Sequence, residues 1–397
     1  MATTACCHRL GATMKIAMIT TDGRAVARHC SDPEPSFGTA AGALLQGLAG
    51  IRECEVHIVS CVQRPVRSPA KLADNIYYHS LVVPKWGWMR GAYLGCIRAV
   101  GKRLREIKPA LVHGQGTERD CALAAVYSGF PNVVTIHGNM RQIAKVVGAR
   151  PFSFPWLAAR FESLTLSKAG GVICLSAHTR RQVELLARTT WVLPNAVDSS
   201  FFGLVRQPAC PKQILCVANI LRLKNQAQLI RALDPLARNT EFELVFLGGA
   251  ETTDAYTQEF FHLLRERSWC CFQGFANRPD LQTALCRATL LVLPSLEENC
   301  PMSVLEAMAA GLPVAAANIG GVPDLITHGA DGLLFDPGKE DSIRAAIAEL
   351  LADDRKREEL GARAKEKALQ CFRPQKIAEK HVAIYRQVIA SSNAPST

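Results

Sequence analysis

The chain has 397 residues, of which 48% are apolar and 20% are charged. At about 150 residues per domain this length predicts two or three domains, and the composition excludes a disulfide-stapled miniprotein and a largely disordered chain. The net charge of +11 is uneven: residues 1–200 hold 24 Lys and Arg against 12 Asp and Glu, whereas residues 201–397 hold 22 against 23. The basic half leaves nucleic acid, an anionic membrane surface and phosphorylated substrates open as partners.

The lack of a recognisable targeting signal and the pattern of the cysteines predict a cytoplasmic protein. No apolar run approaches the roughly 20 residues of a membrane helix, and residues 1–11 lack the apolar core of a signal peptide. The 15 cysteines are odd in number, include two adjacent pairs and form no C-x-x-C motif. This pattern argues against a disulfide framework and against a zinc site, so we expect buried thiols in a reducing compartment.

Short apolar runs rich in β-branched residues alternate with longer helix-like stretches, which is typical of parallel sheets flanked by helices. The first half contains predicted strands at 15–20, 55–60, 110–113, 132–136 and 171–175. The second half contains predicted strands at 213–217, 242–247, 270–273, 289–293 and 314–317. Two such series in succession predict an α/β protein with two Rossmann-like domains.

The proline-containing segment 193–211 between the two series is the predicted linker. The predicted parts are a disordered extension at 1–13, a first domain at 14–195, a second domain at 196–373 and a C-terminal helix at 374–397. That helix starts at a proline and packs on a domain surface, with a return to the first domain as one option. Because parallel sheets bind ligands at the carboxyl ends of their strands, we expect the site in a cleft between the domains.

The most informative segment is LPSLEENCPMSVLEAMAAGLPV at 293–314, which predicts strand, loop, helix, turn and strand. Pro301 suits the first helical position, and the glycine and proline after the helix form a stop signal. Glu298 then lies in the loop before the helix, and Glu306 lies more than one turn inside it. The amides near Met302 and Ser303 can bind a phosphate, and one carboxylate on either side can accept hydrogen bonds from sugar hydroxyls.

These motifs resemble glycosyltransferase family 4, the retaining nucleotide-sugar transferases of GT-B fold, over nearly the whole chain from Met14. The resemblance rests on Glu298 and Glu306 within PS-x-x-E and LEAMA-x-G, on GGVPD at 320–324 with Gly332, and on PNAVD at 194–198. It implies that Glu306 holds the ribose of the donor and that Glu298 contacts the transferred sugar. It also implies that Asn299, Met302 and Ser303 bind the sugar and the diphosphate.

The same resemblance assigns a phosphate clamp after the first strand of the second domain. The family usually has an Arg there and a Lys a few residues later. Here Asn219 occupies the Arg position, and Arg222 and Lys224 follow it. Two cations near a strand end suit a diphosphate, whose charge needs compensation as the leaving bond breaks. Lys224 matches the family lysine, whereas Asn219 departs from the pattern.

In the first domain, His137 follows a predicted strand and, by the resemblance, would contact the donor sugar. Gly38 begins a predicted helix where the family often has two glycines beside the donor phosphate. With Glu298 and Lys224, His137 completes the expected catalytic set. The expected reaction moves a hexose from a nucleoside-diphosphate sugar to a hydroxyl of a glycan or lipid-linked acceptor, with retention, in cell-surface polysaccharide or glycolipid synthesis. No D-x-D sequence occurs, so we expect neither a metal nor another cofactor.

Other classes were weighed on their motifs. No G-x-G-x-x-G follows a strand and no Walker sequence exists, which argues against nicotinamide, flavin and P-loop proteins. A sugar-nucleotide epimerase of the same fold is the nearest enzymatic alternative. The non-enzymatic alternative is a basic nucleic-acid-binding protein, although no recognition motif for nucleic acid appears.

The segment 90–108 holds six basic residues and one acidic residue. Its apolar residues fall at helical spacing, namely Leu94, Ile97, Gly101, Leu104 and Ile107. One hypothesis is a peripheral contact with the inner face of a membrane through Arg98, Lys102 and Arg105. The alternative is a surface helix whose apolar face covers its own core.

Overall fold

The computed structural model describes residues 13–24 and 32–393, so the expected extension at 1–13 lies outside the described residues except for Thr13. The first sheet has the strand order β3-β4-β2-β1-β5-β6-β7-β8, and every pair of neighbours is parallel except β3 and β4. Its strands are β1 (Met14–Ile19), β2 (Cys54–Val62), β3 (Lys71–Ala73), β4 (Ile76–Val82), β5 (Leu111–Gln115), β6 (Asn132–Ile136), β7 (Val172–Cys174) and β8 (Thr190–Val192).

The second sheet is parallel throughout, with the order β11-β10-β9-β12-β13-β14. Its strands are β9 (Lys212–Val217), β10 (Phe242–Leu247), β11 (Cys270–Phe272), β12 (Leu290–Leu293), β13 (Val314–Ala317) and β14 (Leu333–Phe335). The central strands β12 and β13 are buried at every residue, which explains their unbroken apolar sequence.

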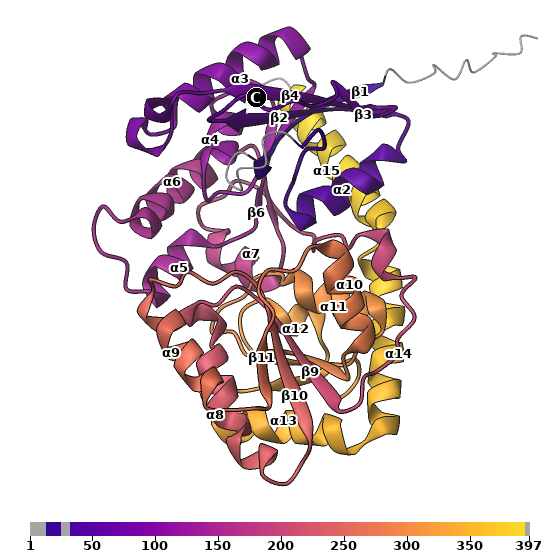
Figure 1. The fold of residues 1–397 in the computed structure, drawn as a ribbon. Coiled ribbons are helices and arrows are strands. Elements are labelled where there is room, and N and C mark those ends of the chain that lie inside the picture. Colours follow the sequence, from indigo (N-terminus) through magenta and orange to yellow (C-terminus); the bar gives the residue numbers. More distant parts are fainter. Residues whose placement is uncertain (1–12, 25–31, 394–397) are drawn as a thin grey trace, which may run out of the picture.

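Helices cover both faces of each sheet, so each domain has a core on either side of its sheet (Figure 1). The first domain contains α2 (Thr39–Ala49), α3 (Leu94–Ile107), α4 (Asp120–Val126), α5 (Met140–Val146), α6 (Phe154–Lys168) and α7 (Ala177–Val183). The second contains α8 (Gln226–Ala237), α9 (Ala255–Arg265), α10 (Arg278–Arg287), α11 (Met302–Ala310), α12 (Val322–Leu325), α13 (Glu340–Ala352) and α14 (Asp354–Cys371), followed by α15 (Pro374–Asn393). None of these helices is long and apolar enough to cross a membrane.

All ten predicted strands are present, with ends within two residues of their predicted positions. Strands β3, β4, β8 and β14 were not predicted, because they are short or lie at sheet edges with mixed exposure. The predicted position of Pro301 was wrong by one residue. Its ψ of 119° is extended, so Pro301 is the residue before the helix and Met302 is the first helical residue.

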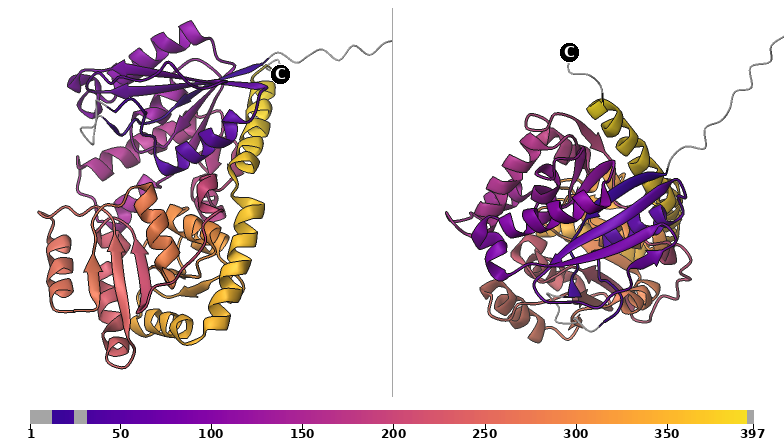
Figure 2. Two further views of the ribbon diagram at one scale, coloured as in Figure 1. Left: turned by 45° about the vertical axis from the view of Figure 1, so that its right-hand side comes forward. Right: turned by 90° about the horizontal axis from the view of Figure 1, so that it is seen from above.

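The last two helices run along one side of both domains (Figure 2). Helix α14 contributes Ala364 and Ala368 to the core of the second domain, and α15 contributes Ile377 and Tyr385 to a core of the first. Helix α15 lies against α2 so closely that a Cβ atom at Gly47 would meet the Pro374 carbonyl oxygen at 2.1 Å. The C-terminal helix therefore returns to the first domain.

The apolar face of the basic helix α3 overlaps the predicted one at Ile97, Leu104 and Ile107 but also includes Cys96 and Val100. Its buried residues are Cys96, Val100, Leu104 and Ile107, which join the core of the first domain. The prediction was wrong for Leu94, which is 51% exposed, because the helix is rotated toward the sheet by the contacts of Cys96 and Val100. What α3 presents to solvent is mainly its basic side.

Candidate functional site

The carboxyl ends of β9 and β12 form the point where the second sheet switches direction. From β9 the chain proceeds outward through β10 and β11, and it then returns to place β12, β13 and β14 on the other side. Open parallel sheets bind ligands at such a switch point. The 3-10 turn Arg222–Lys224 follows β9, and the loop 294–301 follows β12. The topology therefore brings the predicted clamp and the Glu298 loop to one place.

Lys224 and Glu298 meet at this switch point. The Lys224 ammonium donates a hydrogen bond to Glu298 Oε1, and Ser295 Oγ donates to the same oxygen at 2.7 Å. The Glu298 side chain is nearly buried, so the ion pair is shielded from solvent. The sequence did not point to Glu297, although burial and the Glu298 charge raise the pKa of that carboxyl. A single lysine thus faces two neighbouring acidic side chains.

Asn219 and Arg222 occupy different roles beside this pair. Asn219 Oδ1 accepts a hydrogen bond from the Gly249 N–H at 2.8 Å, so it joins the loops that follow β9 and β10. The exposed Arg222 side chain has no hydrogen-bond or ion-pair partner among the residues that the structure describes. Arg222 is therefore an exposed cation, unpaired among the described residues, beside the Lys224–Glu298 pair. Asn219 instead holds the loops after β9 and β10 together.

The start of α11 presents backbone donors toward the same region. The first hydrogen bond of this helix runs from the Leu305 N–H to the Pro301 carbonyl at 3.3 Å, and no side chain caps the helix. The amides of Met302 and Ser303 consequently have no backbone acceptor within residues 13–24 and 32–393. Uncapped first-turn amides at the positive end of a helix favour an anion.

Glu306 lies farther inside α11 and is only 5% exposed. Its carboxylate has no hydrogen-bond or ion-pair partner in the described part of the chain. Burial raises its pKa to about 8. The nearest charges, Arg278 and Asp198, neutralise each other through an ion pair of 2.6 Å. A carboxyl in this position is costly to ionise without a partner, and a ligand that donates hydrogen bonds would supply the missing partners.

The raised pKa of Glu306 predicts a pH-dependent stability. Between its ordinary value of 4.5 and about 8, the folded protein keeps the proton that the unfolded chain has lost. The wild-type protein should therefore lose stability as the pH rises from about 5 to about 8, and Glu306→Gln should lose less. Urea unfolding of both proteins at the two ends of this window measures the difference. Parallel pH profiles would contradict the assigned pKa.

His137 follows β6 and belongs to a network of hydrogen bonds. Its Nε2 lies 2.8 Å from Gln115 Oε1, so Nε2 carries the proton and donates it. Gln115 Nε2 lies 3.3 Å from a nitrogen of the buried His113, whose other nitrogen is 2.7 Å from the Tyr385 hydroxyl on α15. Burial lowers the pKa of His137, which favours a neutral imidazole. The C-terminal helix thus helps to fix the orientation of His137.

Glu118 is a residue of this region that the sequence reasoning missed. Its Oε1 accepts a hydrogen bond from the Gly138 N–H at 2.6 Å, and its charge acts against the lowering of the His137 pKa. Gly116 has a φ of +90°, which favours glycine, and a Cβ atom there would lie 2.3 Å from Glu118 Oε2. The only available signal was its position just after a glycine-containing strand end.

Asn299 joins the two domains. Its amide nitrogen donates to the carbonyl oxygens of Ile136 and His137 at 3.0 and 2.9 Å. Its amide oxygen accepts from Ser176 Oγ at 2.8 Å and from Thr179 Oγ1 at 2.7 Å. The side chain is therefore fully used across the domain boundary. Only the backbone of Asn299 is therefore free for the expected contact with the sugar nucleotide.

The Gly320-Gly321 turn supports the loop that carries Glu298. Gly320 has a φ of +54°, and a Cβ atom there would lie 2.0 Å from the Glu298 carbonyl oxygen. The Gly321 N–H donates to that same oxygen at 2.9 Å. Asp324 of the same motif accepts from the Ala177 N–H at 2.6 Å, which adds a second contact between the domains. The GGVPD motif thus positions Glu298 through its backbone.

Gly38 is the residue before α2, and no side chain caps this helix start. A Cβ atom at Gly38 would meet none of the described residues within 4 Å. No hydrogen bond in the described part of the chain links it to the Glu298 loop. Gly38 is therefore exposed, and no hydrogen bond among the described residues connects it to the residues at the switch point.

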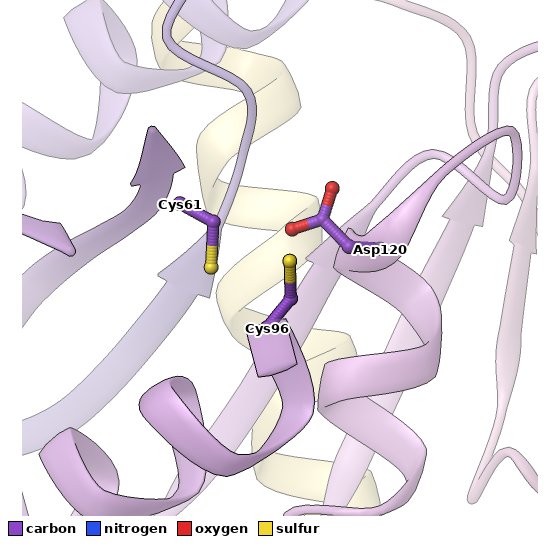
Figure 3. Close-up of side chains that lie close together, drawn as sticks. All are labelled: Cys61, Cys96 and Asp120. Atoms are coloured by element: carbon purple, nitrogen blue, oxygen red, sulfur yellow. The ribbon is translucent and has the colours of Figure 1, made fainter. Parts of the chain in front are cut away.

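Cys61, Cys96 and Asp120 form a separate buried cluster, with ligand atoms that lie within 4.8 Å of one another (Figure 3). Every cysteine in the described ranges is a free thiol. A structural zinc site needs a fourth protein ligand, and none is present in this cluster among the described residues. A hydrogen bond with Cys96 and burial raise the pKa of the Cys61 thiol, and burial raises the pKa of Asp120. The cluster is therefore explained by a neutral Cys61 thiol and a neutral Asp120 carboxyl.

Two Rossmann-like domains whose carboxyl-edge loops meet at Asn299 form a GT-B fold. The Glycosyltransferase Family 4 model matches residues 38–201, and the Glycosyl transferases group 1 model matches residues 205–367. The chain belongs to this family of glycosyltransferases.

Curated relatives and solved structures agree with this assignment. An uncharacterized glycosyltransferase of Methanocaldococcus jannaschii is 31% identical over 44% of this chain and 45% of its own length. The alpha-maltose-1-phosphate synthase of Mycolicibacterium smegmatis is 27% identical over 68% of this chain and 76% of its own. The sucrose-phosphate synthase structure from Thermosynechococcus elongatus superposes with a TM-score of 0.74 at 19% identity, covering 95% of this chain and 100% of that chain. Anabaena HepE in complex with UDP-glucose gives 0.70 at 19% identity, with 94% and 100% covered.

Proposed function

We propose that this glycosyltransferase moves a hexose from a nucleoside-diphosphate sugar to a hydroxyl of a glycan or lipid-linked acceptor, with retention at the anomeric carbon. The observation that carries the proposal is the buried, unpartnered Glu306 beside the uncapped start of α11. A ribose supplies two hydroxyl donors for the carboxylate, and a diphosphate supplies acceptors for the amides of Met302 and Ser303.

The remaining site residues divide between the sugar and the leaving group. Glu298 contacts the transferred sugar after its ion pair with Lys224 opens, and Lys224 turns to the diphosphate. Arg222 adds an open charge that stabilises the nucleotide as it departs. His137, neutral and held by Gln115, accepts a hydrogen bond from a sugar hydroxyl at Nδ1, because its Nε2 proton is already donated to Gln115. The leaving phosphate acts as the base for attack on the same face.

Catalysis in this proposal needs no metal. Lys224, Arg222 and the start of α11 stabilise the negative charge that develops on the diphosphate. In other transferases a bound metal cation has this role. No D-x-D sequence is present to hold such a cation. The cellular role that we propose is the synthesis of a surface polysaccharide or glycolipid.

The relatives support the reaction class and leave the donor base open. One solved structure of the same fold holds UDP-glucose, and a mannosyltransferase of Mycobacterium tuberculosis that is 29% identical over 161 residues is named as GDP-mannose-dependent. A thermal-shift screen against UDP, GDP, ADP and their sugars decides the base. A nucleotide at 100 times its dissociation constant should stabilise the protein by about 2.7 kcal/mol. Absence of a shift with every nucleotide would contradict the proposal.

A turnover assay without acceptor separates the epimerase, and the thermal-shift screen separates the nucleic-acid-binding protein. An epimerase would consume the sugar nucleotide without any acceptor, and it would release no nucleoside diphosphate. A nucleic-acid-binding protein would bind duplex DNA in a salt-sensitive manner and would ignore every sugar nucleotide.

We also propose a peripheral contact with the inner face of a membrane, in which α3 takes part through Arg98, Lys102 and Arg105. All three side chains are exposed. Because the apolar face of α3 covers its own core, this contribution is electrostatic. Each basic residue near an anionic surface contributes about 1 kcal/mol, so the α3 contribution alone should disappear in high salt.

A further inference from the structure

The connection between α5 and α6 stands out from the side of the first domain (Figure 1). We name residues 145–156 the α5–α6 tip. Its exposed apolar side chains are Val146, Val147, Phe152 and Phe154, and Trp156 lies half-buried beside them with its ring centroid 5.4 Å from that of Phe152. Apolar side chains gathered in this way on a protruding hairpin mark an interaction site.

Phe152 is the most exposed member of the tip, at 81%. Its backbone has a φ of +64°, in the left-handed region that side chains other than glycine avoid. The chain therefore accepts backbone strain at a residue whose ring gains almost nothing from the protein's own core. Strained backbone conformations of this kind are concentrated at ligand-contacting and other functional sites.

The charge around the tip decides what that contact is. Residues 141–160 contain Arg141, Lys145, Arg150 and Arg160, and they contain no Asp or Glu. The Arg160 guanidinium lies 4.8 Å from the Trp156 ring centroid, so basic and aromatic groups form one surface. A second copy of this chain would oppose like charges, and a mixed-charge protein surface would leave some of them unmatched. Aromatic rings surrounded by cations match an anionic lipid interface.

We propose that the α5–α6 tip inserts its aromatic side chains into the headgroup region of an anionic lipid bilayer while the surrounding basic residues contact lipid phosphates. In the chain, the tip comes after His137 and α5. The buried Glu162 on α6 accepts hydrogen bonds from the Met140 and Arg141 amides at the start of α5, both at 3.1 Å. These bonds connect the start of α5 to α6. The inference extends the proposed membrane contact of α3 to a second surface, and it is independent of the proposed reaction because lipid binding needs neither donor nor acceptor.

The test is co-sedimentation of the full chain with vesicles of phosphatidylcholine alone or with 30% phosphatidylglycerol. The double variant Phe152→Gly with Phe154→Ser removes both rings, and glycine fits the left-handed backbone, so the variant should fold. Its partitioning onto the anionic vesicles should fall roughly tenfold or more, because two aromatic rings no longer enter the lipid. Brominated lipids should quench Trp156 in the wild type, and Trp156→Phe should remove that part of the quenching.

Matched controls keep the outcome specific. Phe275→Ser removes a ring that is 80% exposed on the second domain, and it should leave vesicle binding unchanged. The triple variant Arg98→Ser, Lys102→Ser, Arg105→Ser should weaken binding in low salt only, whereas the tip variant should weaken it in low and high salt. Equal binding by the tip variant and the wild type would overturn the inference, as would a wild type that ignores anionic vesicles.

Two further results distinguish other occupants and the proposed reaction. If the tip variant converts a dimer to a monomer in sedimentation velocity without vesicles, the tip is an interface between copies and the lipid proposal is wrong. Calorimetric binding of the nucleoside diphosphate identified by the screen should be unchanged in the tip variant. Loss of vesicle binding with retained nucleotide binding supports the inference, and a failed nucleotide screen contradicts only the reaction.

Discussion

Lys224→Ala should lower turnover by an order of magnitude or more, because the leaving diphosphate loses the cation that compensates its developing charge. The structure adds a second reason. Without Lys224, Glu298 keeps only the hydrogen bond from Ser295, and the site gains an unneutralised carboxylate. Initial rates with saturating donor and acceptor measure the effect on kcat. Lys224→Arg should recover part of the rate, since it restores the charge with a different shape.

The control for this variant is Lys339→Ala, which removes an exposed lysine whose carboxylate partner is Asp336, and it should leave turnover unchanged. The same assay tests metal independence. Wild-type activity should survive excess EDTA, because Lys224, Arg222 and the start of α11 supply the positive charge. Activity that EDTA abolishes and manganese restores would refute this electrostatic assignment, as would an unaltered rate for Lys224→Ala.

Glu306→Ala should weaken binding of the bare nucleoside diphosphate at least about tenfold above pH 8, where the carboxyl is ionised, because a charged hydrogen-bond partner contributes roughly 1.5 to 3 kcal/mol. The position supports a large effect, since no protein group competes for this buried carboxylate in the part of the chain that the structure describes. Calorimetry with the nucleotide identified by the screen gives the dissociation constant directly. An unchanged affinity would exclude the ribose role of Glu306.

Glu298→Ala is the matched comparison, because it removes the other carboxylate of the pair. It should leave the affinity for the bare nucleotide unchanged and weaken the affinity for the intact sugar donor. This division follows from geometry: Glu298 lies in the loop before α11, and Glu306 lies inside the helix. Equal losses for both ligands in both variants would contradict separate roles for the two residues.

The sequence alone determined the α/β class, the ten main strands and the bounds of α11 and the start of α15. These features depend on local patterns: apolar β-branched runs predict buried parallel strands, and proline and glycine fix helix ends through their own backbone limits. The spacing of Glu298 and Glu306 likewise placed one carboxylate before the helix and one inside it. Each of these inferences needed only residues that are neighbours in the chain.

Only the tertiary structure decided which partners those residues meet. The bonds from Asn299 to the Ile136 and His137 carbonyls, the contact of Glu118 with Gly138 and the link from His113 to Tyr385 join residues that lie far apart in the sequence. The buried face of α3 was also set by packing, because a helix with apolar residues on several sides can turn more than one of them inward. Local patterns fix what an element is, whereas long-range contacts fix what its side chains touch.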